Sequence, residues 1–271
     1  MPNARSPHSR VTMKVLALGN TGAGKTTQFL TLPGKKFIYL FDPNAILSLQ
    51  GYDVDYEEFL ATGMNLDVKS LSKDNKRVPV MRSTSAAMYE AWERDFEDRI
   101  RSGFFADYDW LGFDSFTTLS SMVMDEILRI NNRPDTWPGQ DDYGPQMLTL
   151  TNIVRQAAAL PINIYFTGHI ETRQDKVTKK VNTQPMMTGR LVQNLPLIFS
   201  EIFLLECTTG PTAVTYTLQT KPDSEFKTVR TSIKGLELFE DVTIDFSQPI
   251  VGQGLGGILN WADKQRKEAA A

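Results

Sequence analysis

The feature that most constrains this chain is a glycine-rich turn that directly follows a short apolar run. The run is Val15–Leu18, and the sequence then reads GNTGAGKTT, in which four residues separate Gly19 from Gly24, Lys25 and Thr26. A backbone that curls around phosphate oxygens needs glycine, because several N–H groups must point inward. Lys25 would then reach the β- and γ-phosphates, and the Thr26 hydroxyl would hold Mg²⁺ at a helix start. The stretch predicts a nucleotide cradle between a strand and a helix.

The predicted contacts with the nucleotide extend over the whole turn. The residues expected to bind it are Gly19, Asn20, Thr21, Gly22, Ala23, Gly24, Lys25, Thr26 and Thr27. The alternative is a chance glycine-rich turn, but the apolar run before it and the helical start after it favour the cradle. ATP and Mg²⁺ are therefore the expected cofactors.

Composition is typical of a globular protein that does not enter a membrane. The 271 residues are 41% hydrophobic and 23% charged, which suits one large α/β domain or two small ones. No apolar run approaches the roughly 18 residues of a membrane span, so no membrane partner is expected. The opening MPNARSPHSR lacks the apolar core of a signal peptide. A net charge of −3 means that any nucleic-acid site must be a local basic patch.

The single cysteine, Cys207, excludes an intrachain disulfide and fits a reducing cytoplasm. It lies in the apolar run 202–207, which predicts a packed core thiol.

Strand-like and helix-like segments alternate along the chain. Strands are expected over 14–18, 37–41, 78–82, 108–113, 162–166, 202–206, 214–219 and 226–229. Helices are expected over 26–32, 85–101, the segment ending at 130, and 143–160, with a polar loop from 168 to about 187. This alternation predicts an α/β fold with a mostly parallel sheet, helices on both faces and late antiparallel strands. We expect a disordered arm over 1–12, one domain over 13–260 and a polar tail over 261–271.

The stretch YDWLGFDSFTTL, residues 108–119, predicts an acid that positions a metal ion. Asp114 ends an apolar strand, where a carboxylate can hold Mg²⁺ through water opposite the phosphate loop. The alternative is a strand-end Asp that caps the next helix, with Ser115, Thr117 or Thr118 as further caps. The glycine-rich turn upstream favours the metal role, so Thr26 and Asp114 are the expected metal residues.

The order of these motifs resembles the core of the RecA-type recombinases, with the turn as Walker A and Asp114 as Walker B. The further segments that carry the resemblance are FIYLFDPNA, NIYFTGHIE, MMTGRLVQNLP and EIFLLE. It extends over about residues 13–235. The segments QDDYGPQM, TGH and TGRL make the chain similar to short phage-encoded RecA-core proteins of single-strand annealing and recombination.

The resemblance implies a RecA-like P-loop ATPase core whose turnover DNA stimulates. It also implies single-stranded DNA and a single-strand-binding protein as partners, and the cytoplasm of a bacterial host cell as the location. The relatives assemble into a homo-oligomer, a ring or filament, with active sites between subunits.

Candidate catalytic residues come from family positions. His169 stands where relatives place a polar sensor of the γ-phosphate, which in many of them is Gln. Asp42 is the carboxylate nearest to the family's catalytic acid and would polarise the attacking water, or it caps the turn at Pro43. Both roles of Asp42 stay open. Glu57 and Glu58 are a weaker alternative for the acid.

The resemblance also implies a cation supplied to the active site of a neighbouring subunit. The candidates are Lys221, Lys227 and Arg230, of which Arg230 is preferred. Such a charge would offset the charge that develops on the transferred phosphoryl group. The alternative is an ordinary hairpin with solvated charges.

Two loops match the family's DNA-contacting loops, residues 129–142 and 171–190. The expected DNA-binding residues are Arg133, Trp137, Arg173, Lys176, Lys179, Lys180 and Arg190. Their cations would pair with backbone phosphates, and an exposed Trp would stack on a base. The alternative is a solvated charged loop, in which Glu171 and Asp175 dilute the positive field.

The predicted function is that of an ATP-binding and ATP-hydrolysing protein that binds single-stranded DNA and promotes annealing or homologous recombination. The first alternative is a nucleotide-binding scaffold or assembly factor without significant turnover, which the two roles of Asp42 leave open. The second is a small-molecule P-loop kinase, which the lack of an arginine-dense lid disfavours.

Overall fold

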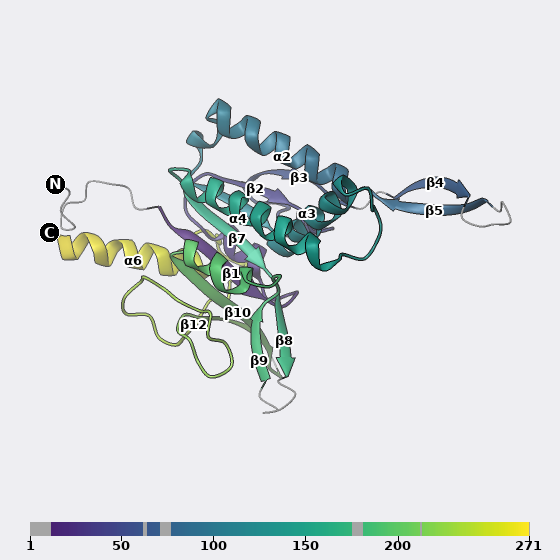
Figure 1. Ribbon diagram of the computed structural model, residues 1–271. Coiled ribbons are helices and arrows are strands. Elements are labelled where there is room, and N and C mark those ends of the chain that lie inside the picture. The colour runs from purple at the N-terminus through teal and green to yellow at the C-terminus, as the bar shows by residue number, and fades with distance from the viewer. Residues whose placement is uncertain (1–11, 62–63, 71–76, 175–180, 212, 271) are drawn as a thin grey trace, which may run out of the picture.

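The computed structural model of the protein describes residues 12–61, 64–70, 77–174, 181–211 and 213–270. Within these ranges the centre is an eight-stranded sheet in the order β12-β11-β10-β1-β7-β6-β2-β3 (Figure 1). Its strands are β1 Lys14–Gly19, β2 Lys36–Leu40, β3 Asp55–Glu58, β6 Trp110–Asp114, β7 Asn163–Gly168, β10 Glu201–Thr209, β11 Val214–Gln219 and β12 Phe239–Asp241.

Most of this sheet is parallel. Parallel pairing joins β10, β1, β7, β6, β2 and β3, and only β11 and β12 pair in antiparallel fashion at one edge. Since β7 lies between β1 and β6, the carboxyl ends of these three strands meet at one edge of the sheet. The predicted α/β fold with late antiparallel strands is confirmed.

Helices cover both faces of the sheet. They are α1 Lys25–Leu30, α2 Ser85–Ser102, α3 Phe116–Ile130, α4 Tyr143–Ala159, α5 Leu191–Asn194 and α6 Gly254–Ala270, with short 3₁₀ turns at Ala45–Ser48, Phe104–Asp107, Gln140–Asp142 and Leu195–Ile198. Leu16 and Leu18 of β1 pack on the side of α2, α3 and α4, whereas Val15 and Ala17 pack on the side of α1 and α6. The alternation of side chains along a strand thus supplies both cores.

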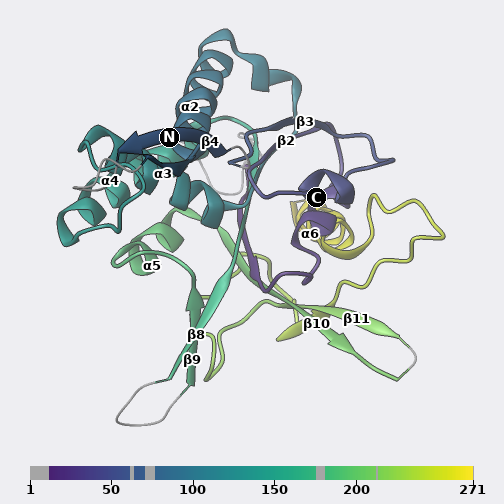
Figure 2. The same ribbon diagram turned by 90° about the vertical axis from the view of Figure 1, so that its right-hand side faces the viewer.

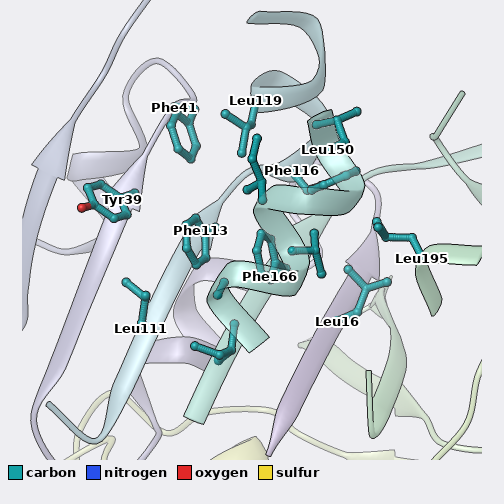
Figure 3. Close-up of a cluster of buried hydrophobic side chains, with 14 of the residues drawn as sticks. Leu16, Tyr39, Phe41, Leu111, Phe113, Phe116, Leu119, Leu150, Phe166 and Leu195 are labelled. Carbon is teal, nitrogen blue, oxygen red and sulfur yellow. The ribbon is translucent and has the colours of Figure 1, made fainter. Parts of the chain in front are cut away.

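A stack of two phenylalanines aligns the ends of β6 and β7. The rings of Phe113 and Phe166 lie 4.2 Å apart at an interplanar angle of 4° (Figure 3). Both side chains are fully buried, and burial of such a ring contributes about 1.5–3 kcal/mol. The next residues are Asp114 and Thr167, so this packing sets the two polar side chains side by side.

Two hairpins lie outside the central sheet. They are β4 Met64–Ser70 with β5 Arg77–Ser83, and β8 Ile170–Gln174 with β9 Val181–Pro185 (Figure 2). The predicted strand 78–82 therefore forms, but in a separate hairpin. The predicted loop 168–187 is wrong over Ile170–Gln174 and Val181–Pro185, which pair as the two strands of this hairpin, and residues 175–180 lie outside the described residues.

Two expectations about the late segments are also wrong. Residues 226–229 form no strand; only a single bridge joins Arg230 to Ile202. Cys207 is exposed, not packed in the core. The reason is that β1 ends opposite Leu205, so β10 continues beyond it paired only with β11.

Helix α6 includes most of the polar tail expected over 261–271, since the chain is helical as far as Ala270. Its start packs against α1: Gly256 N–H donates to Thr31 Oγ1 at 3.0 Å, and Gly252 N–H donates to the Thr31 carbonyl at 2.8 Å. The expected arm 1–12 falls almost wholly outside the described residues. None of the helices in the described ranges is long and apolar enough to cross a membrane.

The close approach of α6 to α1 predicts that Gly256→Ala is destabilising. A Cβ at Gly256 would lie 2.0 Å from the Thr31 carbonyl oxygen, so the helices must separate. We expect the free energy of unfolding, measured by urea denaturation, to fall by about 1–3 kcal/mol. Gly144→Ala in α4 is the matched control, because nothing lies within 4 Å of a Cβ there. The control lies in the first turn of α4, directly before Pro145, and should change stability far less. Equal stability of the two variants would contradict this account.

Candidate functional site

The turn between β1 and α1 has the backbone geometry of a phosphate cradle. Gly22 and Gly24 have φ angles of 81° and 82°, in the left-handed region that favours glycine. No side chain caps α1, which leaves its first backbone N–H groups available to an anion. The predicted nucleotide-binding residues therefore lie together, from the end of β1 to the start of α1.

Lys25 is folded over this turn. Its Nζ donates to the carbonyl of Gly19 at 2.9 Å and to that of Asn20 at 2.8 Å. Burial lowers the pKa of Lys25, while the nearby carboxylates of Asp114 and Asp42 raise it. A phosphate oxygen would offer this ammonium a charged acceptor in place of neutral carbonyls, and such hydrogen bonds are stronger.

The two predicted metal residues are in direct contact. Thr26 Oγ1 donates to Asp114 Oδ2 at 2.6 Å, and Thr167 Oγ1 donates to the other carboxylate oxygen. Burial raises the pKa of Asp114, and the two hydroxyls only partly oppose that effect. The described residues contain no cluster of three or more His, Cys, Asp or Glu side chains that could hold a metal. One hydroxyl and one carboxylate suit Mg²⁺, which takes few protein ligands and completes its shell with phosphates and water.

Asp42 lies beside this pair at the end of β2. Its Oδ1 accepts hydrogen bonds from Ser115 Oγ at 2.9 Å and from Thr118 Oγ1, and His169 Nε2 lies 3.8 Å from Oδ2. Burial raises the pKa of Asp42, but the nearby His169 imidazole and the hydrogen bonds from Thr118 and Ser115 outweigh it and hold the pKa below its ordinary value. The result is a fixed, ionised carboxylate. Sequence reasoning treated Ser115 and Thr118 only as helix caps and missed this role.

His169 connects the polar cluster to the β8–β9 hairpin. Its N–H donates to Thr117 Oγ1 at 3.0 Å, and its carbonyl accepts from Met186 N–H at 2.8 Å. The imidazole thus faces Asp42 while the backbone holds both α3 and the hairpin.

A pocket of about 300 Å³ joins these groups. It is lined by Thr21, Gly22, Gly24, Lys25, Thr26, Thr27, Gln28, Asp42, Pro43, Asn44, Ala45, Ser48, Asp114, His169, Tyr216, Val242, Ile244 and Phe246. Sequence reasoning did not assign the last four to the site: Tyr216 lies on the expected strand 214–219, and residues 242–246 were given no element. The only signal was the apolar alternation in VTIDF, residues 242–246, which does not say what it packs against.

The other candidate catalytic residues lie outside this pocket. Arg230 is exposed and pairs through its backbone with Ile202, near the start of β10. Glu57 and Glu58 lie on the exposed edge strand β3, where Glu57 forms an ion pair with Arg99 at 2.9 Å.

Trp137 is the most exposed large apolar side chain of the described residues, with 93% of its surface accessible. The loop that carries Trp137 is held by hydrogen bonds to the buried Asp142 carboxylate, which accepts one from Arg133 Nη2 at 2.6 Å and one from Asn131 Nδ2 at 3.0 Å. Gly139 N–H adds a third bond at 2.7 Å. Arg133, predicted to bind DNA, therefore has its guanidinium engaged within the loop, whereas Trp137 projects freely.

The remaining DNA candidates are only partly described. Arg190 is exposed immediately before α5, and Arg173 lies on β8. Lys176, Lys179 and Lys180 lie outside the described residues.

A family model described as an AAA domain matches residues 12–229 of the chain. Among solved structures, the KaiC-like protein PH0186 from Pyrococcus horikoshii is 12% identical, with a TM-score of 0.42 and 86% of each chain covered. The flagellar accessory protein FlaH from Methanocaldococcus jannaschii is 11% identical, with a TM-score of 0.38 and coverage of 86% of this chain and 85% of that one. No curated protein matches the sequence.

The two site carboxylates should affect stability in opposite directions. The pKa of Asp42 lies below its ordinary value of 3.8, so its ionised form stabilises the fold above that pH, and this is lost as the pH falls through the folded pKa. The pKa of Asp114 is raised, so its ionised form costs stability until the pH falls through that pKa. At neutral pH, without nucleotide, Asp114→Asn should raise Tm and Asp42→Asn lower it. Each shift should be about 2–4 °C, as for about 1 kcal/mol.

Calorimetric melts over a pH series check both signs. The difference between wild type and Asp42→Asn should shrink on acidification. A lower Tm for Asp114→Asn at neutral pH would contradict this prediction and show that the folded protein stabilises the ionised Asp114 carboxylate.

Proposed function

The chain belongs to the AAA domain family, and from that premise we propose that its pocket binds ATP with Mg²⁺ and hydrolyses it. The contact between Thr26 and Asp114 below the glycine-rich turn carries this proposal. A hydroxyl and a carboxylate at this distance, with Lys25 beside them, are the groups that a magnesium–triphosphate complex requires.

Each polar residue of the site then has a role. Lys25 and the turn N–H groups bind the β- and γ-phosphates, and Thr26 and Asp114 hold the metal ion. When bound, Mg²⁺ neutralises charge on the transferred phosphoryl group. Asp42, fixed by Ser115 and Thr118, polarises the attacking water.

His169 Nε2, close to Asp42, orients the same water or donates to the γ-phosphate. Since its backbone also holds the β8–β9 hairpin, a change at the phosphate can bias the position of that hairpin.

We also propose that the protein forms a homo-oligomer that binds single-stranded DNA and promotes annealing or recombination. The resemblance to phage RecA-core proteins supports this, together with the exposure of Trp137 on a fastened loop. Arg230, remote from its own pocket, would serve the nucleotide of a neighbouring copy. A scaffold that binds ATP without turnover differs from this proposal in one measurable property, the release of phosphate.

Lys25→Ala should remove ATP binding without unfolding the protein. Charged hydrogen bonds contribute about 1.5–3 kcal/mol each, so we expect ATP affinity to fall at least about tenfold and phosphate release to stop. Affinity is measured by calorimetry with Mg²⁺, and Tm checks the fold.

Lys14→Ala is the matched control, since Lys14 is a buried lysine at the other end of β1. Its Nζ donates to the carbonyls of Leu160 and Ile162 at 3.0 and 2.7 Å. This variant should lose about 1–3 kcal/mol of stability yet keep its affinity for ATP. Full ATP turnover by folded Lys25→Ala protein would rule out the proposed nucleotide site. Binding of ATP without turnover by the wild-type protein would favour the scaffold function.

Trp137→Ala should weaken binding of single-stranded DNA by roughly 1–3 kcal/mol if the indole stacks on a base. The loss should persist at high salt, because stacking releases no counterions. Trp261→Ala is the control: that Trp, on α6, is 39% exposed and far from this loop in the sequence. Fluorescence anisotropy across a salt series measures both.

The charged part of the proposed DNA site is tested in the same titration. Reversal of Lys176, Lys179 and Lys180 to Glu should flatten the plot of log affinity against log salt by about 0.7 for each lost phosphate contact. Wild-type affinity and slope in this variant, with no effect of Trp137→Ala, would rule out both loops as the DNA site.

A further inference from the structure

The apolar half of the pocket lining includes residues that follow the family-matched range 12–229. These residues are Val242, Ile244 and Phe246. Tyr216 of β11 lines the pocket too, and its carbonyl accepts from Val242 N–H at 2.9 Å. A Cβ on Gly24 would lie 3.2 Å from the Tyr216 ring, so this aromatic packs directly against the turn. The pocket therefore continues from the phosphate end onto an apolar wall.

The charges of the pocket gather at one end only. The ionisable carboxylate and ammonium groups among its lining residues are Lys25, Asp42 and Asp114, and all three belong to the phosphate end. Pro43 and Ala45 line the same cavity and are uncharged, and Ala45 packs in the same apolar cluster as Val242 and Ile244. This half thus suits a flat, uncharged ring, and it offers a second anionic group no partner.

Phe246 stands at the rim of this wall with 64% of its surface exposed. Its turn is fixed: the Asp245 carboxylate accepts from Ser247 N–H at 2.9 Å and from Ser247 Oγ at 2.6 Å. Gln253 accepts from Asp245 N–H at 2.8 Å and donates back to the Asp245 carbonyl at 3.0 Å. An exposed aromatic side chain on a rigid turn loses little entropy when a ligand covers it.

Gln28 fixes the wall to the phosphate-binding helix. This side chain of α1 is buried; its Nε2 donates to the Val242 carbonyl at 2.7 Å, and its Oε1 accepts from Leu255 N–H at 2.8 Å. Since α1 begins at Lys25, the wall and the phosphate end keep a set spacing within one rigid unit.

We propose that residues 242–246 form the nucleobase-binding wall of this pocket, with Phe246 stacked on the base of the nucleotide whose triphosphate lies on Lys25. This inference rests on the proposed nucleotide binding and adds the residues that hold the base. They lie more than 200 residues after the glycine-rich turn.

The test compares ATP with inorganic tripolyphosphate, which has the phosphates and lacks the base. Binding of each in Mg²⁺ is measured by calorimetry for wild type, Phe246→Ala and Phe246→Tyr. We expect Phe246→Ala to lower ATP affinity about 5- to 150-fold, the effect of one lost base–aromatic stack, and to leave tripolyphosphate affinity unchanged. Phe246→Tyr, which keeps the ring, should bind both as wild type does.

Phe239→Ala is the matched control. Phe239 is 46% exposed on β12 and does not line the pocket, so its loss should change neither affinity. Unchanged ATP affinity in Phe246→Ala would contradict the proposal that residues 242–246 bind the nucleobase. An equal loss of affinity for ATP and tripolyphosphate would contradict it too. Wild-type protein that binds tripolyphosphate as tightly as ATP would refute the wall and keep the phosphate cradle. Wild-type protein that binds neither would refute the nucleotide site itself, and the wall with it.

Discussion

The arrangement of the site depends on one buried carboxylate, that of Asp114, and on the two threonine hydroxyls that bond to it. A carboxylate removed from water is costly unless its oxygens are hydrogen-bonded. Thr26 and Thr167 satisfy one oxygen each, and they come from the helix after β1 and from β7. These bonds connect β6, α1 and β7 at the edge of the sheet where the pocket opens. The stacked rings of Phe113 and Phe166, one residue before Asp114 and Thr167, hold the ends of β6 and β7 in place.

How much of this could be predicted depends on sequence distance. The glycine-rich turn and the strand-end Asp114 are local patterns with a physical reason for each residue, and the structure places them together. The alternation of buried strands and amphipathic helices likewise gave the sheet and its two covered faces. The β8–β9 hairpin was missed because its polar sequence has no apolar side, so its pairing leaves no periodic signal.

Contacts between distant segments could not be predicted from local pattern. Whether Asp42 caps a turn or faces the site depends on hydroxyls of Ser115 and Thr118, which lie more than 70 residues later. The exposed position of Cys207 depends on where β1 stops, not on the apolar residues around the cysteine. The aromatic wall depends on Gln28, whose amide gives no sign in the sequence that it bonds to residues 242 and 255.

The junction between α1 and the C-terminal segment has a consequence for how the protein can be divided. A fragment that ended at residue 229, where the family match ends, would keep the glycine-rich turn, Asp42, Asp114 and His169. It would also uncover Phe29 and Leu30, which are buried in the same apolar cluster as Leu255 and Leu259 of α6. Such a fragment would carry an open apolar face on α1, the kind of surface that drives aggregation. We therefore expect a stable fragment of this protein to extend beyond the family boundary, into α6.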